Sequence, residues 1–316
     1  MTSTSASTVP VAEPGDAAPL RPVALSPSRA KDFMQCPLLF RFRTVDRLPE
    51  PPSPAAVRGT LVHSVLERLF DLPAAGREPA AALQFLEPAW EELRTERPDV
   101  EEMFGSPEDL HEWLVSAREL VERYFQVENP QRLEPAEREK LVEVELASGI
   151  RLRGFVDRLD VAPDGAVRVV DYKTGKSPKP QWAAEAMFQM RFYGLILWRL
   201  TGTPPRRLQL VYLGDGQVLT LDPTPNELLA TEERIEAIWS AITRAATTGN
   251  FQPRRSRLCD WCSFQSLCPA FGGTPPEPPA EGLARLVEAG TAAVAAGAAP
   301  VAVTEADAAL GTPPVR

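Results

Sequence analysis

The stretches GFVDRLD at residues 154–160 and VVDYKTGK at residues 169–176 decide the fold. Both are rich in residues that favour β-strands, and the Pro-Asp-Gly at 163–165 between them is typical of a turn. We therefore predict two neighbouring antiparallel strands that each carry an acid. Asp157 lies midway along the first strand, and Asp171 ends the second.

The length of the connecting loop decides whether the two acids share a face of the sheet. Side chains alternate along a strand, so Asp171 and Lys173 point one way and Tyr172 the other. In a hairpin, the numbers of two paired residues always add up to the same sum. A two-residue turn at 164 and 165 makes that sum 329, and Asp157 and Asp171 would then lie on opposite faces of the sheet. A sum of 328 or 330, from an odd-length loop or a bulge, brings them together. A shared metal therefore predicts an odd loop or a bulge.

The rest of the chain alternates between helical and strand patterns. LVEVEL at 141–146 predicts a further strand, so the three strands form a meander. Apolar residues at helical spacing predict the helices, and β-rich runs predict two more strands. The helices are expected near 60–70, 80–95, 107–126, 181–200 and 226–247, and the strands near 207–213 and 217–222. We expect an α/β fold, with a mixed β-sheet flanked by helices, a helical N-terminal part and a C-terminal cysteine-rich segment.

Composition sets the expected domain limits. Residues 1–24 and 273–316 are rich in Ala, Pro, Ser and Thr, so both are expected to be disordered, apart from a weak helix near 281–293. The folded domain is expected over 25–272, with a helical insertion at about 72–135. The net charge of -9 argues against tight, unaided binding to long DNA, although local basic patches such as RRSR at 254–257 can still bind it.

The sequence also predicts where the protein resides. No apolar run approaches the ~20 residues that cross a bilayer, so no membrane partner is expected. The first residues lack the basic and apolar regions of a secretory signal. A cytoplasmic location is therefore expected, where four cysteines are metal ligands or free thiols more often than disulfides.

Several polar side chains suit a metal site that acts on phosphodiesters. Asp157 and Asp171 offer the oxygen ligands that Mg²⁺ and Mn²⁺ prefer, and His63 ends the segment GTLVH on a predicted helix. Lys173 is a compact cation that can stabilise negative charge on phosphate oxygens. Taken singly, each residue has an ordinary structural explanation: a solvated acid at a strand end, or a histidine packed on a helix. The combination is what points to chemistry.

GTLVH, GFVDRLD, VVDYKTGK and QMRFY at 189–193 together resemble the motifs of RecB-type nucleases in the PD-(D/E)XK superfamily, over roughly residues 25–270. The resemblance implies that His63, Asp157 and Asp171 are metal ligands, with the Tyr172 carbonyl a further candidate. It also implies that Lys173 is the catalytic lysine. Gln189 and Tyr193 match the Gln-x-x-x-Tyr motif, which orients the lysine or the DNA strand.

The four cysteines form a second candidate site. Cys259, Cys262 and Cys268 are closely spaced, and Cys36 lies far upstream. A Cys₄ zinc site and buried free thiols are both open from the spacing alone. One early and three late cysteines also resemble the iron–sulfur branch of the same nucleases, which includes AddB-type and CRISPR-associated relatives. That resemblance implies a 4Fe-4S cluster that joins the two ends of the folded domain, in preference to Zn²⁺.

These features predict a Mg²⁺- or Mn²⁺-dependent deoxyribonuclease, an exonuclease for single strands or duplex ends in DNA repair or recombination. The 316 residues contain no GxxxxGK[ST] motif, so any helicase would be a separate partner. A non-catalytic DNA-binding module and a CRISPR-adaptation nuclease are the alternatives. Aromatic residues beside basic ones are candidates for base stacking or simply for the core: Phe40, Phe42, Trp261 and Phe264.

Overall fold

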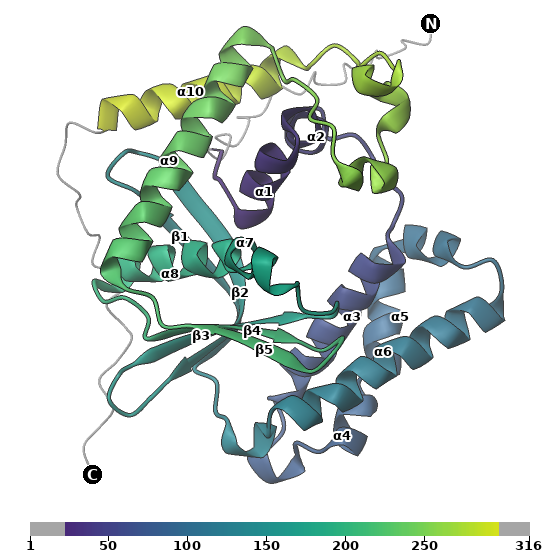
Figure 1. Ribbon diagram of the computed structural model, residues 1–316. Helices are drawn as coiled ribbons and strands as arrows, with labels where there is room; N and C mark the ends of the chain where they lie inside the picture. Colours follow the sequence, from purple (N-terminus) through teal and green to yellow (C-terminus); the bar gives the residue numbers. More distant parts are fainter. Residues whose placement is uncertain (1–22, 297–316) are drawn as a thin grey trace, which may run out of the picture.

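The computed structural model describes residues 23–296, and the predicted tail over 1–22 lies outside them (Figure 1). Its helices are α1 (Pro27–Gln35), α2 (Pro37–Phe40), α3 (Pro54–Leu69), α4 (Pro79–Leu83), α5 (Leu86–Glu96), α6 (Pro107–Val127), α7 (Ala183–Ala186), α8 (Phe188–Thr201), α9 (Pro225–Thr248) and α10 (Ala280–Ala296). Its strands are β1 (Glu137–Glu145), β2 (Arg151–Val161), β3 (Val167–Lys173), β4 (Arg207–Tyr212) and β5 (Gln217–Leu221).

The five strands form one mixed sheet in the order β1-β2-β3-β4-β5. Every neighbouring pair is antiparallel except β3 and β4, which run parallel and are connected through α7 and α8. The prediction of a mixed sheet flanked by helices is confirmed. Paired residues of β2 and β3 sum to 328, as in Arg158 with Val170, because the loop between Val161 and Val167 has an odd number of residues. This register places Asp157 level with Asp171.

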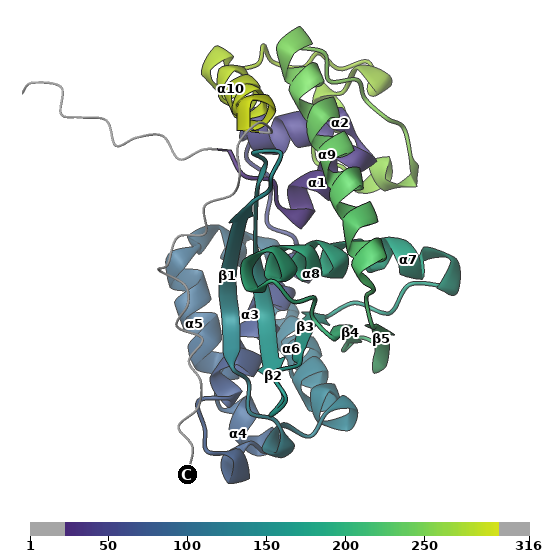
Figure 2. The same cartoon turned by 90° about the vertical axis from the view of Figure 1, so that its left-hand side faces the viewer.

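Helices cover the sheet from two sides, and Figure 2 shows α5 and α8 on opposite sides of β1 and β2. On the α8 side, alternate residues of β3 and β4, such as Val169 and Leu208, join the larger buried cluster. On the other side, Val170 and Tyr172 pack with α3, α5 and α6 in a second cluster. Asp171 and Lys173 therefore follow Val169 to the α8 side, and Tyr172 lies toward α3.

Two predicted helices have different limits in the structure. The helix expected from residue 60 begins at Pro54, because proline suits the first helical turn, where its missing N–H leaves no bond unmade. The helix expected over 181–200 is interrupted, since a 3₁₀ turn at Pro180–Trp182 and the short α7 precede α8. Gly202, in the left-handed conformation with φ of 75°, ends α8.

The weak helix expected near 281–293 corresponds to α10, which runs from Ala280 to Ala296 and belongs to the folded part. This helix packs along α9 (Figure 1), and Leu286 is buried against the larger cluster. Gly290 makes the close approach possible, since a Cβ there would lie 2.4 Å from Thr243 Cγ2. The Ala- and Gly-rich sequence that suggested disorder thus supplies a flat surface for packing. Residues 297–316 lie outside the described part of the chain.

Three of the four aromatic residues considered for base stacking are core residues. Phe40, Phe42 and Phe264 are buried among the N-terminal helices and the cysteine-rich segment, and only Trp261 is exposed, at 78%. The stacking hypothesis is therefore wrong for those three. Ala24 and Leu25 are also buried, and Leu25 pairs with Leu152 beside β2, so the folded part begins before the expected residue 25.

In the described residues, no helix combines the length and the apolar character that crossing a membrane requires.

Candidate metal-dependent active site

His63, Glu139 and Asp157 bring three possible ligand atoms within 4.8 Å of one another. They come from α3, β1 and β2. His63 Nδ1 lies 3.5 Å from Asp157 Oδ2 and 3.8 Å from Glu139 Oε1. All three line a pocket of about 10 Å³, roughly the space that one water molecule fills. The site therefore has the donors and the space for a single ion.

The backbone of β3 orients His63. His63 Nε2 lies 2.9 Å from the carbonyl oxygen of Tyr172. A carbonyl only accepts, so Nε2 carries the proton of this hydrogen bond and Nδ1 faces the two carboxylates. The Tyr172 carbonyl, expected as a possible metal ligand, is thus a hydrogen-bond acceptor for the histidine here. The N–H of Tyr172 donates to Asp157 Oδ2 at 2.7 Å and fixes that carboxylate as well.

Asp171 lies behind this group, nearly fully buried at 1% exposure. Its Oδ1 accepts from Gln189 Nε2 at 2.7 Å, and its Oδ2 lies 2.6 Å from Lys173 Nζ. Lys173 Nζ also donates to Gln189 Oε1 at 3.0 Å. Asp171 Oδ2 is therefore already paired with one cation, the Lys173 ammonium group.

Gln189 and Tyr193 share one face of α8, as their spacing of four requires. Gln189 Nε2 lies 3.1 Å from Tyr193 Oη, so the pair extends the hydrogen-bonded chain from Lys173 and Asp171. Gly154 on β2 makes room for the tyrosine, since a Cβ there would lie 2.5 Å from Tyr193 Cε1. Glycine in the GFVDRLD motif therefore has a packing role.

The carboxylates repel one another in the absence of a cation. The pKa of Asp157 is raised to about 7, chiefly by burial and then by the negative charge of Asp171, while His63 and the Tyr172 N–H oppose the rise. Burial also raises the pKa of Glu139, with His63 opposing and Glu67 and Asp171 adding to the rise. Buried acids that resist ionisation together are relieved by a cation between them.

Sequence reasoning missed Glu139. The strand was expected to begin at Leu141, but β1 begins at Glu137, and its pairing places Glu139 level with Asp157. Glu139 has a φ of 43°, an uncommon left-handed value for a residue with a side chain. The sequence carried no signal for it, because the pairing of Arg138 with Arg158 that places Glu139 beside Asp157 is known only from the structure.

A buried ion network supports the site from the α3 side of the sheet. Arg158, with no exposed surface, donates to both carboxylate oxygens of Glu128 at 2.8 and 2.9 Å and also contacts the hydroxyl of Tyr172. Asp160 accepts from both Arg158 and Arg168. Arg158 thereby holds Tyr172, whose backbone positions both His63 and Asp157.

A sequence model of the PD-(D/E)XK nuclease superfamily matches residues 24–269. The chain belongs to the PD-(D/E)XK nuclease superfamily. The Gene 69 protein of Mycobacterium phage L5 is 25% identical over 298 residues, which cover 80% of this chain and 97% of the phage protein. The Gene 69 protein of Mycobacterium phage D29 is 24% identical over 280 residues, with the same coverage.

Superfamily membership implies a metal-dependent nuclease with DNA as its substrate. The acid site of this nuclease, by which we mean His63, Glu139, Asp157 and Asp171, fits a divalent cation. Its donor set is carboxylate oxygens with one imidazole, and the buried carboxylate of Asp171 lies near enough for its charge to act on Asp157. Lys173 stands at the open side, half-buried, where the wall of a large groove begins.

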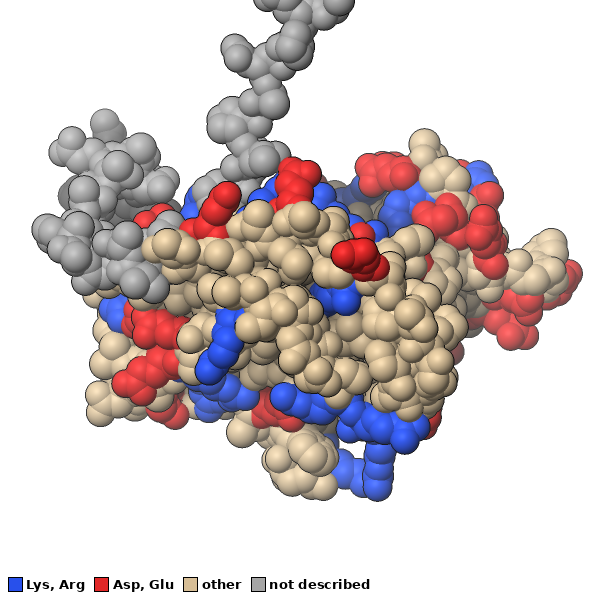
Figure 3. Space-filling model, turned by 90° about the horizontal axis from the view of Figure 1, so that it is seen from above, with Lys and Arg blue, Asp and Glu red and all other residues tan. Residues whose placement is uncertain are grey.

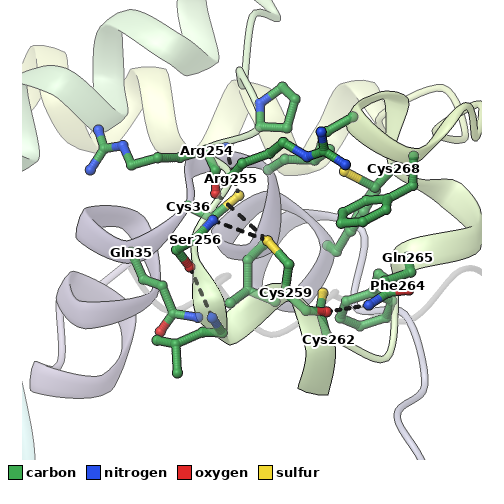
Figure 4. Close-up of a pocket in the computed structure, with 17 residues that line it drawn as sticks. Gln35, Cys36, Arg254, Arg255, Ser256, Cys259, Cys262, Phe264, Gln265 and Cys268 are labelled. Atoms are coloured by element: carbon green, nitrogen blue, oxygen red, sulfur yellow. Dashed lines mark hydrogen bonds between the residues drawn. The ribbon is translucent and has the colours of Figure 1, made fainter.

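The four cysteines of this nuclease line a single pocket between α2 and the C-terminal turns, although Cys36 precedes Cys259 by 223 positions (Figure 4). Two backbone N–H groups donate to sulfur: Arg254 to Cys36 and Ser256 to Cys259, both at 3.4 Å. Burial raises the pKa of Cys262; the Phe264 N–H opposes this, and the other three thiols add to it.

Proposed function

We propose that this protein is a Mg²⁺- or Mn²⁺-dependent DNA exonuclease that carries a structural 4Fe-4S cluster. The observation that carries the first part is the convergence of His63, Glu139 and Asp157 beside the Asp171–Lys173 pair. Superfamily membership over residues 24–269 supports the same chemistry. A role in DNA repair or recombination in the cytoplasm, beside a separate helicase, completes the proposal.

In this proposal His63, Glu139, Asp157 and Asp171 hold the divalent ion. When bound, the ion supplies Lewis acidity: it neutralises phosphate charge and lowers the pKa of water. Lys173 places its ammonium group on the open side of Asp171, where it can stabilise the charge that develops on a phosphate oxygen. Gln189 holds the ammonium group through Oε1 and Asp171 through Nε2, so it fixes the distance between them.

The cysteine pocket carries the second part of the proposal. All four cysteines line it, and thiolates are the ligands of both structural zinc and iron–sulfur clusters. The two N–H···S hydrogen bonds are of the kind that tune iron–sulfur clusters, and they favour a 4Fe-4S cluster.

The test compares linear and circular single-stranded DNA, with Mg²⁺ or Mn²⁺, for the anaerobically purified protein and for Asp171→Ala. We expect linear DNA to be degraded from its ends, circular DNA to survive, and Asp171→Ala to cleave neither. Cleavage of circles would replace the exonuclease with an endonuclease. No hydrolysis of any substrate by the native protein would favour a non-catalytic DNA-binding module.

A further inference from the structure

A large groove begins at the catalytic lysine and is separate from the small acid pocket. Lys173, Gln189 and Tyr193 line one part of it, and α1, β2 and the turn before α7 line the rest. Its volume is about 1150 Å³, above the ~300–1000 Å³ of ordinary small-molecule sites. The groove therefore has the dimensions for an extended ligand.

Two aromatic side chains are exposed in this groove. Phe155 on β2 is 51% exposed, and Trp182, just before α7, is 58% exposed. Neither belongs to the buried clusters, so packing of the core does not account for them. Figure 2 shows α7 at one side of the molecule, beyond the end of α8. The turn at Pro180–Trp182, directly before α7, is thereby held away from the core. Exposed aromatic faces in a groove are suited to stacking on flat ligands.

Basic side chains line the same groove. Lys31, Arg29 and Arg153 lie along it, with Glu185 as the acid among the lining residues. Arg29 and Arg153 also line an adjoining pocket together with Arg47. The two acids of that pocket, Asp46 and Glu281, are paired with Arg41 and Arg285, so the positive charge of the other three arginines continues beyond the groove. The protein's net charge of -9 is thus not spread evenly, and Figure 3 shows Lys and Arg gathered along one edge of the upper face.

Arg29, Arg47 and Arg153 lie close enough for their positive charges to repel one another. Burial, followed by the charges of Arg153 and Arg47, lowers the pKa of Arg29. Within residues 23–296, neither Arg47 nor Arg153 forms an ion pair with an acid. Clustered cations without counter-charges favour a polyanion, because phosphate groups relieve their repulsion.

We propose that this groove binds single-stranded DNA, with bases stacked on Phe155 and Trp182 and phosphates on Arg29 and Arg153, and leads the strand to Lys173. Stacking on a side chain requires an unpaired base, whose face is covered in a duplex. The proposal rests on the proposed nuclease function only for the direction of the strand toward Lys173.

The test measures binding in EDTA, where the acid site lacks its metal and the DNA stays intact. A labelled dT oligonucleotide and a duplex of equal length are titrated with native protein, Phe155→Ala, Trp182→Ala and Leu200→Ala, with thermal melting as the folding check. Leu200 on α8 is the control, since it is 43% exposed and does not line the groove. Loss of one stacked base predicts roughly 5- to 150-fold weaker oligonucleotide binding for each groove variant and native-like binding for the control.

A second arm tests the cations. Arg153→Gln should lower the slope of log affinity against log salt by roughly 0.7, the value for one phosphate contact on a single strand. Arg118→Gln, at an exposed ion pair on α6, should leave the slope unchanged. Native-like binding by Phe155→Ala and Trp182→Ala, or duplex binding as tight as that of the single strand, would overturn the proposal.

Hydrolysis of bis(4-nitrophenyl) phosphate, a substrate too small to need the groove, separates this proposal from the proposed function. If the native protein hydrolyses it and Trp182→Ala binds the oligonucleotide normally, the groove assignment fails and the nuclease stands. If Trp182→Ala loses binding and nothing is hydrolysed, the nuclease assignment fails and the groove stands.

Discussion

The acid site and the cysteine pocket both gather metal-binding side chains, but the chain builds them in different ways. The acid site takes His63, Asp157 and Asp171 from long helices and strands, and hydrogen bonds already fix each of them. The cysteine pocket takes Cys36 from the junction of α1 and α2, and the other three from 3₁₀ turns near the end of the domain. The first site is therefore set by the fold, whereas a ligand in the second would help to hold the fold together.

The variant with the largest expected effect on the acid site is Lys173→Met, which tests whether the fold alone sets this site. We expect DNA hydrolysis to fall at least ~100-fold, because a preorganised charge at the reacting phosphate is lost. Binding of Mn²⁺ should be retained or strengthened, since a cation is removed from beside Asp171. Lys176→Met, three residues away and exposed, is the control. Weaker Mn²⁺ binding by Lys173→Met, measured by calorimetry, would mean that the lysine supports the ligands rather than the reaction.

Cys36→Ser tests the other half of the comparison. We expect loss of absorbance near ~400 nm and a decrease in unfolding free energy of roughly 3–5 kcal/mol, the range for opening a long covalent loop. The double variant Cys36→Ser/Cys268→Ser should be no less stable than the single one, because both residues hold the same group. Additive losses in thermal melting, or an unchanged spectrum, would contradict a shared cluster.

Glu139→Gln tests whether Glu139 is a metal ligand in the acid site. Removing one charged ligand should weaken Mn²⁺ binding roughly 10- to 100-fold. Glu137→Gln, two residues earlier on β1, is the matched control, since Glu137 pairs with Lys140 instead. Electron paramagnetic resonance of free Mn²⁺ measures both variants without DNA. Equal affinities would remove Glu139 from the ligand group.

The smallest effect concerns pH in the absence of metal. The pKa of Asp157 is raised to about 7, so the folded state binds this proton more tightly than the unfolded chain does. This tighter proton binding stabilises the folded state fully below pH 3.8, the ordinary pKa of the group, and the stabilisation is lost as pH rises through about 7. In EDTA, the melting temperature of native protein should therefore fall by several degrees relative to Asp157→Asn between roughly pH 5.5 and 8. Parallel melting curves across that range would refute the assignment.

Much of the sheet could be predicted from sequence because its signals are local. The alternation of β2 and β3 and the Pro-Asp-Gly turn indicated the hairpin, and the order of polar motifs brought His63, Asp157 and Asp171 to one region. The odd loop that a shared metal requires is present.

The rest depends on features that local patterns do not record. Glu139, which was missed, depends on a left-handed backbone in β1, and no strand propensity signals it. The packing of α10 along α9 depends on small residues at the contact, and the choice between stacking and core for Phe40, Phe42 and Phe264 depends on burial by other segments. Such burial is decided by which segments meet, which periodicity within a segment does not record.

The register of the β2–β3 hairpin has a consequence for how this sequence can change over time. Asp157 and Asp171 lie opposite each other only when the numbers of paired residues in β2 and β3 add up to 328. Insertion or deletion of one residue between Val161 and Val167 would therefore turn one acid to the other face of the sheet, unless a bulge compensated for it. Homologues that keep the site should therefore vary this loop in steps of two residues, a parity rule that an aligned family would display directly.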